Sequence, residues 1–332
     1  MAENMGQIHS DVVLSTRVRL ARNINGIPFP VRLNALEKQK LNYGICKILS
    51  EKGCKLRATE MSALYPYEII SLAERHLISP EFASSYEGRM LLMTDDEKIS
   101  IMLQERDHIR IQGFEDGLQP EKAYDNTLYY DELLDNALHF AFDSKLGYLN
   151  QHPKDIGTGM SASVLMHLPA LSVSGVMTKI SATAAKLGFV IRGSYGDAAS
   201  VKGDIYRISN SVTMGISEEQ ALENLKTLAL QITTKEHSAA EKLVTDISIK
   251  DRINRSAGII KNSVLLSADE MMELLSWVRL GALYGITDAD ASLICKLMMT
   301  MQPATINVLA KQKLTEAAAD EIRAATVKQI FR

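Results

Sequence analysis

The sequence has few cysteines and no long apolar run. Its 332 residues include three cysteines, Cys46, Cys54 and Cys295, whose spacing fits neither a CxxC motif nor a set of metal ligands, so we interpret them as reduced structural thiols. No apolar stretch approaches the roughly 18 residues that span a bilayer, and residues 1–11 are polar without the apolar core of a signal peptide. These absences favour a cytoplasmic protein without a membrane partner.

An excess of one charge and the common phosphate-binding loops are lacking as well. The 37 lysines and arginines are dispersed among 40 aspartates and glutamates, which gives a formal net charge of -3 and does not indicate a nucleic-acid partner. The sequence contains neither a GxGxxG motif nor a Walker A motif. A site for a phosphorylated ligand must therefore gather positive side chains locally.

Alternation of apolar and polar residues predicts an antiparallel sheet in the first part of the chain. The predicted strands cover residues 90–93, 99–103, 108–112, 189–192 and 205–208. Helical patterns cover residues 121–142 and 169–187. Because strands joined by short turns are followed by helices in blocks, we predict an α+β fold with a mainly antiparallel sheet flanked by helices.

Capping patterns predict that the rest of the chain is helical. They lie at Ser217 with Gln220, at Ser267 with Glu270, at Thr287 and at Thr315. A chain of 332 residues exceeds the size of most single cores. We therefore predict two domains, an α+β domain over residues 1–240 and an all-α domain over residues 241–332.

Arg17 and Arg19 lie two residues apart in a segment with strand character. This spacing directs both guanidinium groups to one side of the strand. Two forked donors on one face suit a polyphosphate, because arginine contacts phosphate in a bidentate and directional manner. The alternative interpretation of this pair alone is a solvated strand face with ion pairs.

Four segments in one order resemble the guanidino kinase (phosphagen kinase) family. They are LSTRVRLARN at 14–23, QERDHIR at 104–110, GYLNQHPKDIGTGMSASV at 147–164 and RGSYGD at 192–197. From residue 13 to residue 324 the chain is most similar to the bacterial protein-arginine kinases of that family. The resemblance implies a transferase that uses ATP and Mg²⁺ to phosphorylate arginine side chains of proteins.

The same resemblance implies roles for individual residues. Arg17, Arg19, Arg110 and Arg192 match family arginines that hold the ATP phosphates. Glu105 matches an acidic residue near the magnesium shell, with no direct protein ligand to the metal.

Four positions depart from the family pattern. Arg106 replaces the glutamate that accepts a proton from the target, His152 a reactive cysteine, Ser161 a fifth phosphate-binding arginine, and Asp197 a second glutamate that holds the substrate. A guanidinium cannot accept a proton at neutral pH, so Arg106 predicts weak or absent phosphoryl transfer. His152 is interpreted either as a replacement base, since neutral imidazole accepts protons near pH 7, or as a polar loop residue packed against Pro153.

Two hypotheses account for the new arginine at position 106. Arg106 binds phosphate in place of the family arginine that Ser161 replaces, or it lies in the substrate-arginine slot paired with Asp197 as a built-in pseudosubstrate. The corresponding alternatives for function are an impaired protein-arginine kinase and a pseudokinase, a silent regulator that binds nucleotide, protein arginine or an intact kinase partner.

Near the C-terminus, residues 319–324 resemble a phosphoarginine-reading motif that lacks its first arginine. Asp320 and Arg323 would form the remaining pocket, and a solvated helix face is the alternative interpretation. The resemblance further implies protein substrates bound through arginine, a homodimer, and a zinc-bearing activator or an intact kinase paralogue as partners. We interpret His108 and His167 as structural histidines.

Overall fold

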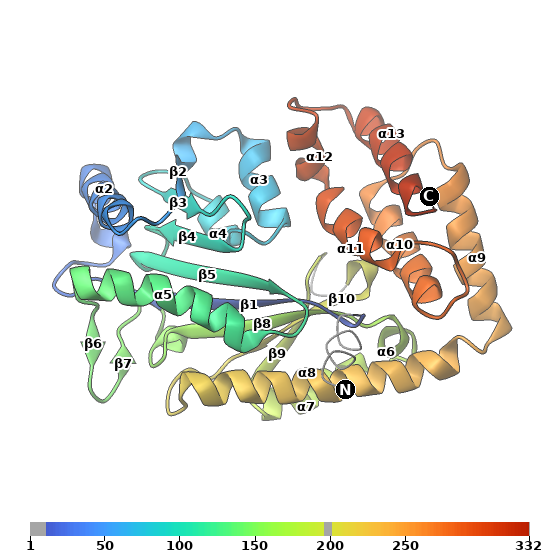
Figure 1. Ribbon diagram of the computed structural model, residues 1–332, viewed down its shortest axis with the longest axis horizontal. Helices are drawn as coiled ribbons and strands as arrows, with labels where there is room; N and C mark the ends of the chain where they lie inside the picture. Colours follow the sequence, from blue (N-terminus) through green and yellow to red (C-terminus); the bar gives the residue numbers. More distant parts are fainter. Residues whose placement is uncertain (1–10, 196–200, 332) are drawn as a thin grey trace.

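One antiparallel sheet organises the computed structural model, which describes residues 11–195 and 201–331 (Figure 1). Across the sheet the strands are β2 (Arg57–Glu60), β3 (Met90–Met93), β4 (Ile99–Leu103), β5 (Ile109–Asp116), β1 (Val13–Arg22), β8 (Met160–His167), β10 (Ile205–Asn210) and β9 (Phe189–Gly193). The five predicted strands belong to this sheet, and the predicted α+β class is confirmed. A separate hairpin joins β6 (Phe142–Asp143) to β7 (Gly147–Tyr148).

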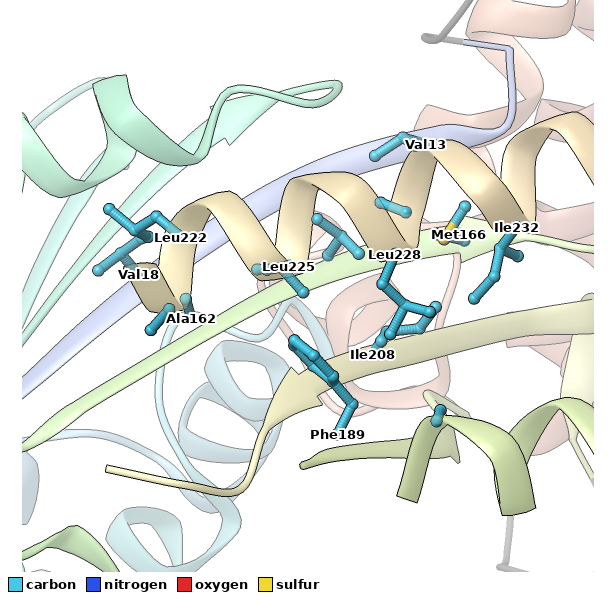
Figure 2. Close-up of a cluster of buried hydrophobic side chains, with 14 of the residues drawn as sticks. Val13, Val18, Ala162, Met166, Phe189, Ile208, Leu222, Leu225, Leu228 and Ile232 are labelled. Carbon is cyan, nitrogen blue, oxygen red and sulfur yellow. The ribbon is translucent and has the colours of Figure 1, made fainter. Parts of the chain in front are cut away.

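Long helices cover one face of the sheet (Figure 1). They are α2 (Ala35–Glu51), α5 (Pro120–Leu138), α7 (Met177–Lys186) and α8 (Glu218–Leu243). Leu222 and Leu225 of α8 pack with Val18 of β1, Ala162 of β8 and Ile208 of β10 in one buried cluster (Figure 2). Each buried leucine, isoleucine or valine of this cluster stabilises the fold by roughly 1.5–3 kcal/mol. Because strand side chains alternate, the intervening residues of these strands lie on the other face of the sheet.

The opposite face of the sheet is covered only at its two ends. At one end α3 (Pro66–Glu74) and α4 (Pro80–Ala83) pack on β3 and β4 through a cluster that includes Phe82 and Met102. At the other end Leu165 of β8 belongs to the core of the C-terminal helices, together with Met272 and Met298. Between these two covers lies a cavity of about 280 Å³, lined by residues of both covers and of the sheet.

The C-terminal part of the chain consists of helices. They are α9 (Ile247–Asn262), α10 (Ala268–Leu283), α11 (Ala291–Thr300), α12 (Pro303–Leu309) and α13 (Glu316–Val327). The predicted caps at Ser217, Ser267 and Thr315 are confirmed, since each side chain accepts a backbone hydrogen bond in the first turn. The predicted cap at Thr287 is wrong, because α11 begins after Asp290, whose carboxylate accepts from two backbone amides.

Two predicted helices differ from the observed ones. The helix predicted over 121–142 ends at Leu138, because His139 adopts a φ of 54° and Phe140 donates its amide to the Asp135 carboxylate. The helix predicted over 169–187 is divided into α6 (Pro169–Val173) and α7, since Gly175 between them has a left-handed φ of 70°.

The fold also contains short 3-10 helices. They are η1 (Pro30–Arg32), η2 (Met61–Ala63), η3 (Pro153–Asp155), η4 (Lys202–Asp204) and η5 (Lys328–Phe331). Residue 240, the predicted domain boundary, lies in the last turn of α8. In the described ranges 11–195 and 201–331, no helix is both long and apolar enough to cross a bilayer.

Candidate active site

The loop between β4 and β5 is a tight turn that directs charged side chains toward the sheet face between the two covers. Gln104 has a φ of 65°, and its amide donates to the carbonyl of His108 at 3.0 Å. Residues 104–108 thus separate β4 from β5, as the predicted strand ranges 99–103 and 108–112 required for all but His108. His108 is structural, because its Nδ1 accepts from the Ile24 amide at 3.1 Å and its Nε2 lies 2.8 Å from the Pro28 carbonyl.

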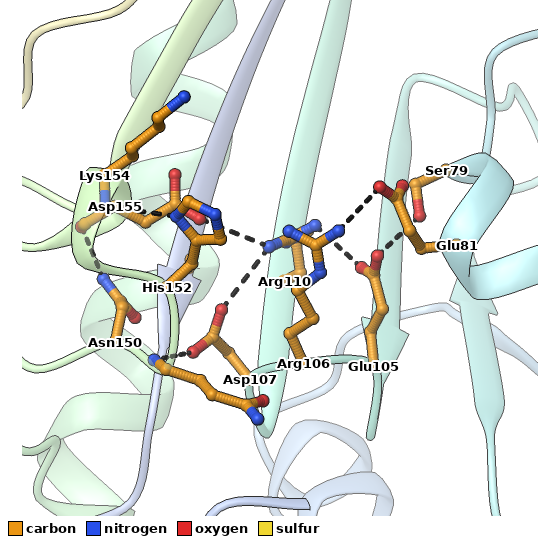
Figure 3. A network of polar contacts seen from close by, with 12 residues as sticks. Ser79, Glu81, Glu105, Arg106, Asp107, Arg110, Asn150, His152, Lys154 and Asp155 are labelled. Carbon is orange, nitrogen blue, oxygen red and sulfur yellow. Dashed lines mark hydrogen bonds and ion pairs between the residues drawn. The ribbon is translucent and has the colours of Figure 1, made fainter. Parts of the chain in front are cut away.

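Three carboxylates surround the guanidinium of Arg110 (Figure 3). Arg110 Nη1 donates to Glu105 Oε2 at 2.8 Å, and Nη2 lies 3.4 Å from Asp107 Oδ2 and 3.8 Å from Asp155 Oδ2. Glu105 accepts a second bond from the hydroxyl of Ser79 at 2.7 Å. The predicted phosphate ligand and the predicted acidic residue are thus brought together as a buried ion pair.

Arg106 extends toward α4 and forms an ion pair with Glu81 (Figure 3). The Nη2 to Oε1 distance is 2.7 Å, and the two side chains are 41% and 53% exposed. An exposed pair of this kind contributes about 0–1 kcal/mol to stability. Asp197 lies outside the described residues, so the predicted pairing of Arg106 with it stays a prediction.

His152 acts as the cap of a short helix. Its Nδ1 accepts a hydrogen bond from the Lys154 amide at 3.2 Å, at the start of η3. The neutral tautomer that makes this bond carries its proton on Nε2. A role as base would therefore require the cap to be released, and the interpretation of His152 as a loop residue agrees with the observed contact.

Three arginines of the sheet point into the space between the two covers, and we call them the arginine row. Arg17 and Arg19 lie on β1, and Arg207 lies on β10, on the same face by strand alternation. Within ranges 11–195 and 201–331, none of the three forms an ion pair with a carboxylate. Ser161 of β8 lies directly opposite Arg19.

The predicted phosphate ligand Arg192 lies beside the arginine row. It is exposed on β9, opposite Arg207 of β10 in the strand register. The two side chains therefore belong to the same face of the sheet.

Burial and neighbouring positive charges lower the pKa values of the guanidinium groups in the arginine row. Burial, followed by the charges of Arg207, Arg19 and Arg110, lowers the pKa of Arg17 well below its ordinary value. Burial and the charge of Arg110 lower the pKa of Arg19 to about 10, although Glu105 partly opposes the shift. A bound polyanion would relieve this repulsion, so the electrostatics suit a phosphorylated ligand.

Sequence reasoning missed Arg207. A signal was present, because Arg207 alternates with the apolar residues Tyr206 and Ile208 in a predicted strand. Its place beside Arg17 depends on the order β1-β8-β10, which pairing over long sequence distances decides.

The C-terminal motif residues are occupied by structural contacts. Arg323 is buried at 2% exposure, and its guanidinium donates to the carbonyls of Met301 and Leu266 and pairs with Asp320. The interpretation of Arg323 as part of a solvated helix face is therefore wrong. His167 is buried between Ser276 and Arg279, as expected for a structural histidine.

Comparison with known proteins assigns the family. The family model "ATP:guanido phosphotransferase, C-terminal catalytic domain" matches residues 38–239, and the model "Protein-arginine kinase McsB C-terminal domain" matches residues 246–332. A protein-arginine kinase of Halothermothrix orenii is 39% identical over 322 residues, which cover 96% of this chain and 92% of that protein. The chain belongs to the protein-arginine kinase family. A second member of this family, from Clostridium tetani, is 36% identical over 97% of this chain and 95% of its own length.

Solved structures of other guanidino kinases share the fold of this protein-arginine kinase homologue. Lombricine kinase superposes with a TM-score of 0.60 and 22% identity, covering 70% of this chain and 68% of its own. The substrate-free duplicated taurocyamine kinase of Schistosoma mansoni gives a TM-score of 0.61 at 18% identity, covering 92% of this chain and 48% of its own. At these identities the likeness concerns the fold.

Proposed function

We propose that this protein binds ATP on the arginine row and recognises protein arginine, but transfers the γ-phosphoryl group slowly or not at all. The observation that carries the proposal is the ion pair of Arg106 with Glu81. Arg106 stands where the family has its proton-accepting glutamate, and its guanidinium is paired with the Glu81 carboxylate (Figure 3). The reaction therefore lacks its expected base.

The target nitrogen must lose a proton as it attacks phosphorus, and an arginine target has a pKa above about 12. The other groups near the loop are engaged. Glu105 accepts from Ser79 and Arg110, Asp107 is fully buried and hydrogen-bonded, and His152 caps a helix. Loss of a general base removes roughly two to four orders of magnitude in rate, which is the extent of impairment that we expect.

Binding of ATP is supported by the arginine row, whose charges have no carboxylate partner in the described part of the chain. Mg²⁺ would reach the site mainly on phosphate oxygens and water, as it does at many nucleotide sites. Within residues 11–195 and 201–331, no group of three or more His, Cys, Asp or Glu side chains is arranged to hold a metal. Glu105 is the nearest acidic candidate, and it would have to share its carboxylate with Arg110.

The family also motivates proposals about partners. Protein substrates or protein partners would bind through arginine, a homodimer would form through the C-terminal helices, and a zinc-bearing activator or an intact kinase paralogue would act on the same protein.

The test is a phosphorylation assay with ATP and an arginine-rich protein, read as acid-labile phosphoarginine. We expect the unmodified chain to remain near background. A variant with Arg106→Glu, His152→Cys and Ser161→Arg is expected to gain about 100-fold or more. Because the new carboxylate would face Glu81, the variant is also made with Glu81→Gln.

Calorimetric titration with ATP and Mg²⁺ tests the binding half of the proposal. The unmodified protein should bind ATP, and Arg17→Gln should weaken that binding. Robust phosphorylation by the unmodified chain would contradict impaired transfer, and absence of ATP binding would contradict the nucleotide site.

A further inference from the structure

Arg207 brings a positive charge to the sheet face that the family pattern does not account for. Its Nη2 donates to Ser194 Oγ at 3.3 Å, which is a neutral partner. No carboxylate of the described residues forms an ion pair with Arg207. Its guanidinium is buried, and this burial lowers its pKa. A desolvated cation without a counter-charge is costly, so the position favours an incoming anion.

Arg207 and Arg17 line the same cavity of about 280 Å³, and three of the four acids around that cavity have partners of their own. Glu97 pairs with Arg75 at 2.6 Å, and Glu115 pairs with Lys122 at 2.9 Å. Two further acids line the cavity, namely Asp96, which accepts from the Thr94 hydroxyl, and the exposed Asp116. The positive charge without a partner thus belongs to the two arginines of the sheet.

Neighbouring side chains orient the Arg207 guanidinium. Ser194 Oγ, which accepts from Arg207, lies 3.1 Å from Nε2 of His76. The ring of His76 packs on Tyr195 with centroids 5.0 Å apart. Burial and the nearby arginine charges lower the pKa of His76 well below its ordinary value, so the ring is neutral at pH 7 and its Nε2 can accept a hydrogen bond from the Ser194 hydroxyl.

The strand register orders the cationic groups along the face. Arg110 lies opposite Ala21 of β1, Arg19 and Arg17 follow along β1, and Arg207 lies in the row of Ser15 through Leu165. From residue 21 to residue 15 a strand advances about 20 Å. Arg207 therefore lies at the end of the row that is remote from the Glu105 loop. The family chemistry would place the γ-phosphate of ATP at the Glu105 loop.

We propose that Arg207 is a further nucleotide-binding residue, which contacts the α-phosphate side of the ATP triphosphate. This inference rests on the proposed function, in that ATP lies along the arginine row with its γ-phosphate toward Glu105. Relative to the family pattern, the positive charge absent at Ser161 is thereby regained further along the face. Such a shift keeps nucleotide binding without restoring a charge at the reacting end.

Isothermal titration of ATP, ADP, adenosine and inorganic tripolyphosphate into the unmodified protein and into Arg207→Gln tests the inference. We expect Arg207→Gln to weaken ATP and ADP equally, by at least about 10-fold, because a charged hydrogen bond is lost. Any adenosine binding should be unchanged. Arg207→Lys keeps the charge without the fork and should retain most of the affinity.

Arg255→Gln is the matched control, because Arg255 is an exposed arginine of α9 and its loss changes net charge equally. Thermal melting verifies that each variant is folded, and Arg207→Met, which also removes the charge but keeps an unbranched side chain, replaces Arg207→Gln if the latter is not. Unchanged ATP and ADP binding in Arg207→Gln would overturn the inference and leave the proposed function intact. A loss confined to ATP would contradict the α-phosphate position.

Two results would separate the inference from the proposed function. If the unmodified protein binds tripolyphosphate through Arg207 but neither nucleotide, the anion site stands and the nucleotide function fails. If it binds none of the phosphorylated probes, both are rejected.

Discussion

Four arginine side chains of this protein lie in four different environments, which depend on the groups that the fold places around each guanidinium. Arg110 is enclosed by three carboxylates, and Arg106 pairs with one at the surface. Arg323 is buried among carbonyls, whereas Arg17 faces a cavity without an acidic partner among the described residues. Whether the charge of an arginine is available for a ligand therefore depends on the groups that surround its guanidinium.

Glu236 provides a residue-scale prediction about pH. It is buried on α8, where its carboxylate accepts from the amides of Ala170 and Leu171 at 2.8 and 3.0 Å. Burial raises its pKa from 4.5 to about 7 despite these bonds. The folded state then holds a proton that the unfolded state releases, so the contribution to stability is present below pH 4.5 and is lost as the pH rises through about 7.

We expect this loss to amount to at most about 3 kcal/mol in the free energy of unfolding. Glu236→Gln cannot ionise and should remove that part of the pH dependence. Urea denaturation of both proteins at pH 5 and pH 8 measures the difference. An identical change for the two proteins would show that Glu236 does not titrate in this range.

At the scale of elements, β5 and α5 approach closely because one strand residue has no side chain. A Cβ atom added to Gly113 would lie 2.7 Å from the carbonyl oxygen of Ala123 and 2.9 Å from Cγ2 of Thr127. One contact is with helix backbone, which cannot move aside without shifting α5. The strand carries Arg110 three residues earlier, so this packing also supports the site.

Gly113→Ala should therefore destabilise the protein by about 1–3 kcal/mol, as overpacking of a core does. Gly44→Ala is the control, because Gly44 lies within α2 and a Cβ there would meet nothing within 4 Å. That change should stabilise by up to about 1 kcal/mol through helix propensity. Chemical denaturation of both variants measures the effect, and equal stabilities would refute the close approach.

At the scale of the whole molecule, hydrogen bonds between α3 and α12 join the two covers of the sheet face, and we call this set of bonds the clasp. The carboxylate of Glu74, at the end of α3, accepts from the amides of Ala304 and Thr305 and from the Thr305 hydroxyl at 2.8–2.9 Å. Ser71 adds a hydroxyl bond to Thr305 at 3.0 Å. Because α3 leads into His76 and Ser79, the clasp links the C-terminal helices to both ends of the candidate site.

Glu74→Ala should loosen this link, since each hydrogen bond to a charged group contributes about 1.5–3 kcal/mol. Amide hydrogen exchange in α12 is expected to accelerate by at least about 10-fold, with less change in α10. Glu51→Ala, which removes an exposed ion pair with Lys47, is the control and should leave exchange in α12 unchanged. Equal protection of α12 in all three proteins would contradict the clasp.

Much of the fold could be predicted because its signals are local. Alternation marked the strands, serine and threonine caps marked helix starts, and the two-residue spacing of Arg17 and Arg19 placed both on one face. The predictions failed where a local pattern was ambiguous. Gly175 interrupts a helical stretch that is otherwise periodic, and Asp290 rather than Thr287 caps α11.

The sequence by itself determined the family, five of the eight strands of the sheet and the presence of an arginine at position 106, because each depends on residue type and short spacing. Only the tertiary structure decided that Arg106 pairs with Glu81, that Arg323 is buried, and that Arg207 joins the arginine row. These outcomes depend on contacts between residues distant in the chain. Such contacts follow from strand order and helix packing, which no local pattern contains.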